Sequence, residues 1–544
     1  MAMNSGIYGA ISSENNSLGL IESGVLPEQA HFVDSEAESY ALNGVCLNLL
    51  EIFGNEAPRA HDFRAVLMSP DRFEEMEGPV QGFHFDKQRC RLLLHTDFAR
   101  QQPVYYYHSE AHFVFASSLA DVVSILRGLN VPVKADVQAA AMLLTFASVL
   151  GEKTLVSGVK KLMPGHSLLY LDGRVQTNPR SSLLNVSRDI TGLSDAVNMI
   201  DSSFQCATDR MVAVNELHGR AHVNLLSGGI DSRMVFLSMA KKTPDINCLC
   251  FSVEDYLDHQ ISRKIATDFG ANYQFVNLNN GEYMCDMATV TQYDGSINYL
   301  ASAHHKHALE SANFSNAGLI ASGQLGNEIL AEFYMQDASA DNVINSVMTM
   351  PGAHGYCHDA VQAAWSDAPE STVFKLLNKG FLYTNSAAYS TKPHGVLYSP
   401  FTSQEFVKNA LRLHPDLLGK HRVYLEWMRS RFPDALRYKW ERYRVKPVQG
   451  LVLEAAKIRM KVLARFIHPL TGFRYASMSP VQYWYDEMSQ VQAFYRETFN
   501  EKRCQLDALP ELADFVDRNF EDMSITNKAS VLTLLSALEK YIHA

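Results

Sequence analysis

Residues 222–240 read HVNLLSGGIDSRMVFLSMA and decide the fold. The apolar run 222–226 predicts a buried strand, Ser-Gly-Gly predicts a tight turn, and the residues from Asp231 onward predict a helix. Two adjacent glycines let the backbone approach an oxyanion without a Cβ in the way. The helix amino terminus offers unpaired N–H groups and a positive dipole end to the same anion. The segment therefore predicts a phosphate-binding loop; the alternative is a plain turn that Asp231 and Ser232 only cap.

Further apolar runs follow this segment along the chain. INCLCFSV (246–253), YQFVNL (273–278) and AGLIASG (317–323) each predict a strand, with helical segments between them. Strands that alternate with helices predict a parallel sheet with helices on both faces. The region 194–450 is therefore expected to be an α/β domain, and residues 448–544 are expected to be mostly helical.

The first third of the chain has a different pattern. Short β-type runs alternate with turn signals, as in 82–98 and in 166–175, where Asp172-Gly173 predicts a hairpin turn. This pattern predicts an antiparallel, sheet-rich domain with a few helices. The polar stretch 176–192 that follows is expected to be a linker.

Length and composition narrow the class of protein. A chain of 544 residues is too long for one core, so two or more domains are expected. The formal net charge of -11 gives no general attraction to nucleic acid or to anionic membrane surfaces. The sequence has no run of 18 apolar residues, no secretory signal at its start and no metal-type spacing among its eight cysteines. We expect a reduced, cytoplasmic protein with no nucleic-acid or membrane partner.

Several segments, in this order along the chain, resemble the asparagine synthetase superfamily. They are Ser5-Gly6-Ile7-Tyr8-Gly9, the strands within 82–126, TLVSGVKKLMPGHSL (154–168), the SGGIDS loop (227–232), SGQLGNEIL (322–330), YSPF (398–401) and Tyr443-Arg444-Val445-Lys446. The SGGIDS loop itself resembles the pyrophosphate-binding loop of ATP pyrophosphatases. The resemblance implies a degenerate glutaminase-like α+β domain of Ntn type at 1–185, an ATP pyrophosphatase-type α/β domain at 194–450 and a helical extension at 451–544.

The first of these segments departs from the family pattern. The glutaminase nucleophile of the family is an amino-terminal cysteine, whose free α-amino group acts as the base. Ser5 stands in that place and is preceded by four residues, so it has no free α-amino group. The resemblance therefore implies that glutamine hydrolysis is lost and that the first domain is retained as a scaffold.

The resemblance also assigns residues to a site for ATP and Mg²⁺. Those expected to bind the nucleotide are Leu226, Ser227, Gly228, Gly229, Asp231, Ser232, Val253, Ser322 and Gly323. Asp231 and Glu328 are the expected metal ligands, because Mg²⁺ prefers carboxylate and phosphate oxygens. Asn327 replaces an aspartate of the family motif, which weakens the metal site unless Glu328 or Asp294 compensates.

Lys446 and Gln324 are the catalytic candidates. Lys446 is expected to neutralise charge on the α-phosphate in the transition state. Gln324 occupies the family position that attends the attacking amine, where a glutamine can accept a hydrogen bond but cannot act as a useful base.

A histidine cluster lies between the two loops in sequence. His304, His305 and His307 have the spacing of a metal site on a helix, but the sequence offers them no companion ligands. We expect these three side chains to be exposed on a helix surface.

The resemblance implies an ATP-dependent synthetase that adenylates a carboxylate, transfers it to an amine, and forms AMP and pyrophosphate. β-Lactam synthetases and lasso-peptide cyclases resemble asparagine synthetase, lack its cysteine and use an amine already present in the substrate. A natural-product cyclisation is therefore the leading hypothesis, with a lasso-type peptide macrolactam ahead of a small β-lactam. Its partners would be a small-molecule or peptide carboxylate, or a precursor peptide and its protease. The alternatives are a catalytically inactive binding or regulatory protein and an ammonia-dependent asparagine synthetase; a homodimer is compatible with all of them.

Overall fold

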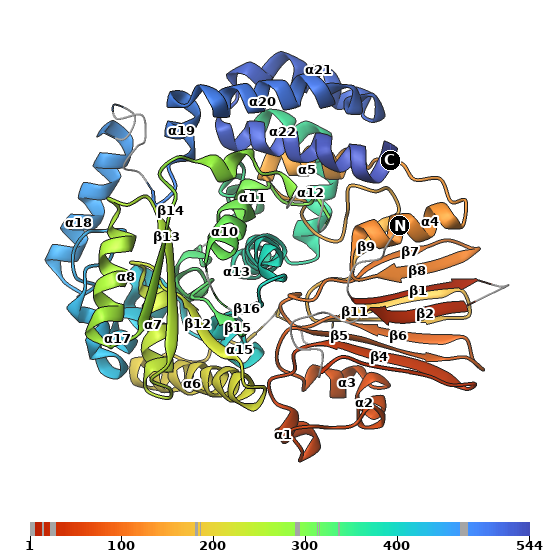
Figure 1. Ribbon diagram of the computed structural model, residues 1–544, viewed down its shortest axis with the longest axis horizontal. Helices are drawn as coiled ribbons and strands as arrows, with labels where there is room; N and C mark the ends of the chain where they lie inside the picture. The colour runs from red at the N-terminus through yellow and green to blue at the C-terminus, as the bar shows by residue number, and fades with distance from the viewer. Residues whose placement is uncertain are drawn as a thin grey trace.

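Three β-sheets organise the part of the chain that the structure describes, two in the amino-terminal region and one in the central region (Figure 1). The computed structural model describes residues 6–12, 16–21, 29–179, 183–184, 186–288, 294–312, 314, 316–335, 338–467, 470 and 477–543. Ser5, the predicted place of the lost nucleophile, lies outside the described residues. Over these ranges, no helix has both the length and the apolar character needed to cross a membrane.

The two amino-terminal sheets are antiparallel. The first has the order β2-β1-β8-β7-β9, with β1 at Gly6–Ser12, β2 at Asn16–Ile21, β7 at Tyr105–His108, β8 at His112–Ala116 and β9 at Val159–Lys161. The second has the order β11-β10-β6-β5-β4-β3, with β3 at His31–Asp34, β4 at Glu38–Gly44, β5 at Val80–Asp86, β6 at Arg91–His95, β10 at His166–Leu171 and β11 at Arg174–Pro179.

These two sheets pack face to face through apolar side chains. Phe83 of β5 meets Phe115 of β8 with ring centroids 5.4 Å apart, and both belong to one buried cluster drawn from the two sheets. Helix α2 (Ala60–Leu67), with α3 (Pro70–Glu74) beside it, lies against β4 and β5, while α4 (Leu119–Gly128) lies against β7 and β8. The region is thus layered helix, sheet, sheet, helix (Figure 1), and the predicted antiparallel domain is confirmed.

The hairpin that joins β10 and β11 has the predicted turn. Asp172 has φ 50° and Gly173 has φ 70°, and Leu171 pairs with Arg174 on either side. Positive φ at both central residues is the requirement of a type I′ turn. The linker prediction is wrong for residues 176–179, because they pair with β10 as the edge strand β11.

The central sheet is parallel throughout, as predicted from the alternation of strands and helices. Its order is β14-β13-β12-β15-β16, with β12 at Ala221–Leu225, β13 at Ile246–Ser252, β14 at Asn272–Asn277, β15 at Ala317–Ala321 and β16 at Val396–Tyr398. The helices next to it include α6 (Leu193–Leu217), α7 (Ile230–Ala240), α8 (Leu257–Asp268) and α10 (Leu300–Ser311). Helix α6 lies against β12 and β15, and α8 lies against β13 and β14.

The strand order of this sheet reverses between β12 and β15. From β12 the chain builds outward through β13 to β14, then returns to place β15 on the other side of β12, where Asn224 pairs with Ala321. In open parallel sheets, ligands bind outside the carboxyl ends of the strands at such a reversal. The loops that follow β12 and β15 are the SGGIDS and SGQLGNE segments, so the fold brings the two motifs to one place.

Helices fill the rest of the chain. Between β15 and residue 450 they are α11 (Ala340–Asn345), α12 (His358–Ser366), α13 (Ser371–Lys375), α14 (Asn385–Ala387), α15 (Gln404–Leu411), α16 (Pro415–Leu418) and α17 (Arg422–Arg431). The carboxyl-terminal ones are α18 (Leu451–Val462), α19 (Val481–Glu487), α20 (Ser489–Lys502), α21 (Pro510–Asn519) and α22 (Ile525–Leu538). Helix α22 is buried almost all round and packs against α5 (Val137–Phe146), so the carboxyl-terminal helices reach back to the amino-terminal half (Figure 1).

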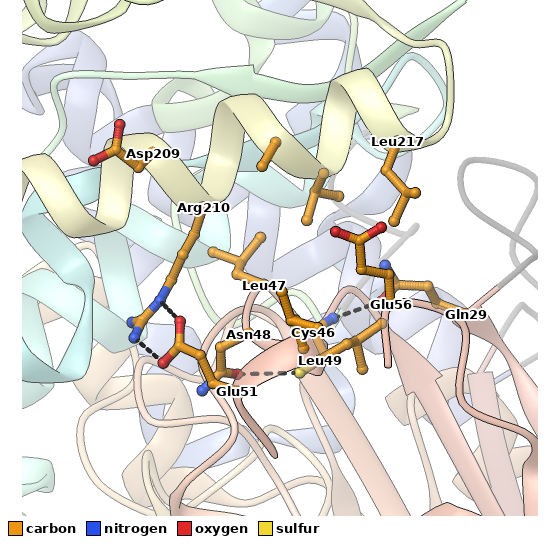
Figure 2. Close-up of a pocket in the computed structure, with 13 residues that line it drawn as sticks. Gln29, Cys46, Leu47, Asn48, Leu49, Glu51, Glu56, Asp209, Arg210 and Leu217 are labelled. Atoms are coloured by element: carbon orange, nitrogen blue, oxygen red, sulfur yellow. Dashed lines mark hydrogen bonds and ion pairs between the residues drawn. The ribbon is translucent and has the colours of Figure 1, made fainter. Parts of the chain in front are cut away.

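A cavity of about 240 Å³ lies where the amino-terminal layer meets α6 (Figure 2). Leu47, Leu49 and Leu217 supply part of its apolar lining. Beside it, Arg210 of α6 donates from Nε to Glu51 of α1 (Leu49–Phe53) at 2.7 Å. None of the predicted site residues lines this cavity, so we regard it as part of the contact between the two halves of the protein.

Candidate active site

A second cavity lies at the carboxyl ends of β12, β13 and β15, where the reversal of strand order predicts a ligand site. Its volume is about 240 Å³. It is lined by Leu225, Leu226, Ser227, Gly229, Asp231, Ser232, Leu249, Cys250, Phe251, His304, His305, Ser322, Gly323, Gln324 and Met478. Eight of these residues come from the sequence-based predictions: seven of the nucleotide-binding set, and Gln324.

Two serines hold the SGGIDS loop in shape. The backbone N–H of Ser227 donates to Ser232 Oγ at 3.1 Å, and the hydroxyls of the two serines lie 2.9 Å apart. The N–H of Gly229 donates to Ser227 Oγ at 3.1 Å. Helix α7 begins at Ile230 with Gly229 as its N-cap residue, and no side chain caps it. The amino terminus of the helix therefore keeps its positive end free of a capping side chain and directed at an anion site.

Gly228 faces away from the cavity. Its N–H donates to Asp258 Oδ1 at 2.9 Å, and a Cβ built on it would lie 2.9 Å from Glu441 Cβ. Arg233, from the next helical turn, donates to the carbonyls of Gly228 and Gly229. Gly228 does not line the cavity, and its N–H already has a partner; its contact with the nucleotide stays a prediction.

Asp258 and Glu441 form an acidic pair behind the loop, which the sequence did not reveal. Burial raises the pKa of both carboxyls, and that of Glu441 reaches about 7 because the nearby Asp258 adds charge repulsion. The Oε2 atom of Glu441 is buried without a hydrogen-bond partner. Asp258 follows a strand end at the start of α8 and could have been noticed; Glu441 is 213 positions after Gly228, and no local pattern marks it.

The two motif loops touch through their backbones. A Cβ built on Gly323 would lie 2.3 Å from the N atom of Ser232 and 2.6 Å from the carbonyl carbon of Asp231. Only a residue without a side chain fits there. The YSPF motif supports the second loop, because Ser399 Oγ donates to the carbonyl of Gln324 at 2.7 Å. Two of the predicted motifs thus meet at the cavity, and the third supports one of them.

Asp231 and Glu328 form the candidate metal site. Burial raises the pKa of Asp231 well above its usual range, and charge repulsion from Glu328 raises it further; burial also raises the pKa of Glu328. Tyr424 donates its hydroxyl to Asp231 Oδ1 at 2.5 Å, and the Oδ1 atom of Asn327 is buried without a partner.

These oxygens suit a divalent cation. Two half-buried carboxylates that repel each other are stabilised by a cation between them, and the orphaned amide oxygen of Asn327 offers a third ligand of the type that Mg²⁺ takes. Among the described residues there is no group of three or more His, Cys, Asp and Glu side chains that could hold a metal. Asp294, the predicted substitute ligand, instead accepts hydrogen bonds from Tyr105 and Ser296.

Lys446 and Val253 lie outside the cavity lining, as do Gly228 and Glu328. The side chain of Lys446 is exposed, in the segment that follows the bridge between Trp440 and Val445. The N–H of Val253 donates to the carbonyl of Met478 at 2.9 Å, so Val253 adjoins the lining through that residue. Lys446 is absent from the cavity lining, and its catalytic role stays a prediction.

The expectation for the histidine cluster was wrong. His304 and His305 are half-buried and line the cavity, and His307 is half-buried against Tyr283, with ring centroids 6.3 Å apart. The reason is tertiary: α10 runs next to the carboxyl end of β13, where Phe251 covers both rings at 5.7 Å and 5.2 Å. That a helix residue is polar does not show whether its side chain lies at the surface or in a cavity.

Two family models match the chain. One is described as a glutamine amidotransferase domain and matches residues 68–180; the other is described as asparagine synthase and matches residues 216–383. No curated protein matches the chain significantly.

Similarity to solved structures is weak. The allosteric regulatory enzyme of purine biosynthesis is 10% identical, with a TM-score of 0.20, over 45% of this chain and 62% of that one. Glutamine phosphoribosylpyrophosphate amidotransferase from B. subtilis, in complex with ADP and GMP, is 9% identical, with a TM-score of 0.19, over 55% of this chain and 58% of that one. This chain spans less than two thirds of the length of each of these two structures, and their TM-scores support no inference about function.

The order of the two family models is informative. The amidotransferase match covers strands β5 to β11 of the antiparallel sheets, and the asparagine synthase match covers strands β12 to β15 of the parallel sheet with both motif loops. With these two domains in this order on one chain, the protein belongs to the asparagine synthetase family.

Proposed function

We propose that the protein is an ATP-dependent ligase that adenylates a carboxylate and joins it to an amine as an amide. The observation that carries this proposal is the meeting of two motif loops over one cavity, at the reversal point of a parallel sheet. The asparagine synthase match supports ATP-dependent amide ligation at a coarse level.

The proposed reaction has two steps. A carboxylate oxygen of the substrate attacks the α-phosphorus of ATP, the bond to the β-phosphate oxygen breaks, and pyrophosphate leaves. The amine nitrogen then attacks the carbonyl carbon of the acyl-adenylate, the bond to the phosphate oxygen breaks, and AMP leaves while the amine proton passes to solvent. Holding both groups in one cavity supplies acceleration through proximity.

Different residues would bind the pyrophosphate, the metal ion, the amine and the α-phosphate. The uncapped amino terminus of α7 and the hydroxyls of Ser227 and Ser232 would bind the departing pyrophosphate. A magnesium ion bound by Asp231, Glu328 and Asn327 would neutralise phosphate charge. Gln324, at the cavity wall, would accept a hydrogen bond from the amine. Lys446 would neutralise charge on the α-phosphate.

The serine at position 5 is our reason for proposing where the amine comes from. Because Ser5 stands where the family has its nucleophilic cysteine, we propose that the chain does not produce ammonia from glutamine and that the amine is already present in the substrate. We therefore favour the cyclisation of a peptide or small-molecule carboxylate, with a lasso-type macrolactam first and a precursor peptide and its protease as the associated components. The domain bounds 1–185, 194–450 and 451–544, a cytoplasmic location and a homodimer belong to the same proposal.

Pyrophosphate release tests this function directly. Purified protein is given Mg·ATP, hydroxylamine as a trapping amine, and a panel of carboxylates that includes aspartate and peptides with a free amino terminus and an acidic side chain. We expect carboxylate-dependent pyrophosphate, AMP and a hydroxamate. Asp231→Ala and Lys446→Ala should each lower the rate about 100-fold or more. Lys264→Ala, which removes an exposed lysine on α8, should not. A panel that releases no pyrophosphate contradicts the proposal.

A non-catalytic binding or regulatory protein is the second candidate. Two observations favour it: Lys446 is exposed outside the cavity lining, and the N–H of Gly228 is taken by Asp258. Such a protein would bind ATP, with no carboxylate in the panel stimulating pyrophosphate release. An ammonia-dependent asparagine synthetase, the third option, would form AMP only with aspartate and ammonium chloride together.

A further inference from the structure

The cavity at the switch point has a polar end and an apolar end. The polar end is formed by the two motif loops, with Ser227, Asp231 and Ser322 among its lining residues. At the apolar end, Leu249 and Phe251 from β13 and Met478 from the carboxyl-terminal region lie with His304 and His305. A nucleoside triphosphate has the same division, with charged phosphates at one end and a flat, largely apolar base at the other.

The apolar end is built from aromatic rings that meet one another at tilted and edge-to-face angles. The rings of His304 and His305 have centroids 4.3 Å apart, and Phe251 lies 5.7 Å from the first and 5.2 Å from the second. Tyr283 closes the far side of His304 at 6.2 Å. Aromatic rings bind nucleobases by stacking.

A hydrogen bond fixes the tautomer of His304. Its Nδ1 lies 3.2 Å from the carbonyl oxygen of Leu300, one helical turn earlier. A carbonyl can only accept, so Nδ1 must carry the proton, and Nε2 of the neutral ring is left with a lone pair. Burial lowers the pKa of His304 to about 4, which keeps the ring neutral near pH 7. His304 therefore presents an acceptor, not a donor, on its other nitrogen.

We propose that the base of the nucleotide lies at this apolar end and that His304 Nε2 accepts a hydrogen bond from the exocyclic 6-amino group of adenine. The pairing selects adenine over purines with a 6-oxo group, because that oxygen also carries lone pairs and would leave two acceptors facing each other. A buried acceptor left without its donor lowers the affinity for the nucleotide. His304 is thus a residue that determines which nucleotide binds. This inference rests on the proposed function, since it takes ATP as the nucleotide.

Calorimetric binding of Mg·ATP and Mg·ITP to the full chain tests the inference. The two nucleotides share the triphosphate and the ribose and differ in the 6-position chemistry of the base. We expect the wild type to bind ATP about tenfold or more tightly than ITP. His304→Phe keeps a flat ring without the acceptor, and its ratio of ATP to ITP affinity should fall to within about threefold. His307→Phe, a change in the same helix outside the cavity lining, should keep the wild-type ratio.

The possible binding results distinguish a failure of the inference about His304 from a failure of the proposed function. Equal affinity of the wild type for ATP and ITP overturns the role of His304, and this comparison does not depend on any variant folding. An undiminished ratio in His304→Phe overturns it as well. Binding of neither nucleotide by the wild type overturns the proposed function itself, and the inference with it.

Discussion

The carboxylate of Asp258 accepts the backbone N–H of Gly228 at 2.9 Å, so the glycine loop is fastened from behind by an acid on the neighbouring helix α8. The opposite side of the loop, at Ser227, Gly229 and Ser232, lines the cavity. Gly228 is thus held by Asp258, while Gly229, the N-cap residue of α7, donates its N–H to Ser227 Oγ at 3.1 Å within the loop and lines the cavity. The two adjacent glycines have different physical roles.

The hydrogen bond between Gly228 and Asp258 predicts different results for two substitutions of Asp258. Asp258→Ala removes the acceptor and leaves the N–H of Gly228 unpaired, which costs about 1–3 kcal/mol and loosens the loop, so ATP affinity should fall. Asp258→Asn keeps an oxygen acceptor and removes negative charge near the phosphates, so ATP affinity should equal or exceed that of the wild type. Calorimetric titration with Mg·ATP measures both. Equal effects of the two variants would show that the hydrogen bond does not hold the loop.

Glu441 predicts a pH dependence of stability. Burial and the nearby Asp258 raise the pKa of Glu441 to about 7 from 4.5, so between these values the folded protein holds a proton that the unfolded chain releases. Stability contributed by this group is therefore present at low pH and is lost as the pH rises through about 7. Glu441→Gln is neutral at every pH and should be the more stable protein at pH 8, by up to about 3 kcal/mol, and no different near pH 4.5.

Urea unfolding of Glu441→Gln and wild type at pH 5 and pH 8 provides the measurement. Glu497→Gln, which changes an exposed glutamate on α20, is the matched control and should alter the free energy of unfolding by less than about 0.5 kcal/mol at both values. If Glu441→Gln were no more stable than the wild type at pH 8, the surroundings of Glu441 would have to stabilise its ionised carboxylate.

The sequence predicts the parts of the fold in which local signals and tertiary structure agree. An apolar run before two glycines became β12 and its loop, and Asp172-Gly173 became a hairpin turn with positive φ at both residues. The order of the motifs along the chain placed both loops correctly at one cavity, because adjacent parallel strands end at the same edge of a sheet.

The sequence could not place side chains that reach the cavity from other parts of the chain. His304 and His305 look like polar positions of a helix, yet the packing of α10 beside β13 makes them part of the cavity lining. Glu441 packs against Gly228, in a loop that lies more than 200 positions earlier in the sequence. Lys446 is the reverse case: its motif is present in the sequence, its side chain is exposed in the structure, and its role stays a prediction. Such positions depend on how distant segments pack, which no local pattern encodes.

Asp231 predicts a magnesium dependence of nucleotide binding. Asp231→Asn keeps an oxygen for the hydroxyl of Tyr424, which lies 2.5 Å from Oδ1, and removes one of the two charges that would bind the cation. We expect the gain in ATP affinity that Mg²⁺ gives to fall about tenfold, while binding in EDTA is unchanged or stronger. Asp245→Asn, at an exposed position before β13, should retain the full gain. An unchanged magnesium response in Asp231→Asn would remove this residue from the metal site.

Gly323 gives the sharpest structural prediction, because it joins the two motif loops. Its Cβ position lies 2.3 Å from the N atom of Ser232 and 2.6 Å from the carbonyl carbon of Asp231, and backbone atoms cannot move aside as a flexible side chain can. Gly323→Ala should therefore push the SGQLGNE loop off the start of α7. We expect ATP affinity to fall at least about tenfold, and thermal stability to fall as well, since overpacking costs about 1–3 kcal/mol.

Gly355→Ala is the matched control, because a Cβ there meets nothing within 4 Å and the same methyl group is added. It should bind ATP as the wild type does. Fluorescence titration with a nucleotide analogue and thermal melts followed by circular dichroism compare the two variants. If Gly323→Ala bound ATP normally, the two loops could separate without loss, and their contact would not define the site; if both variants lost binding equally, the effect would come from replacing glycine in general rather than from this contact.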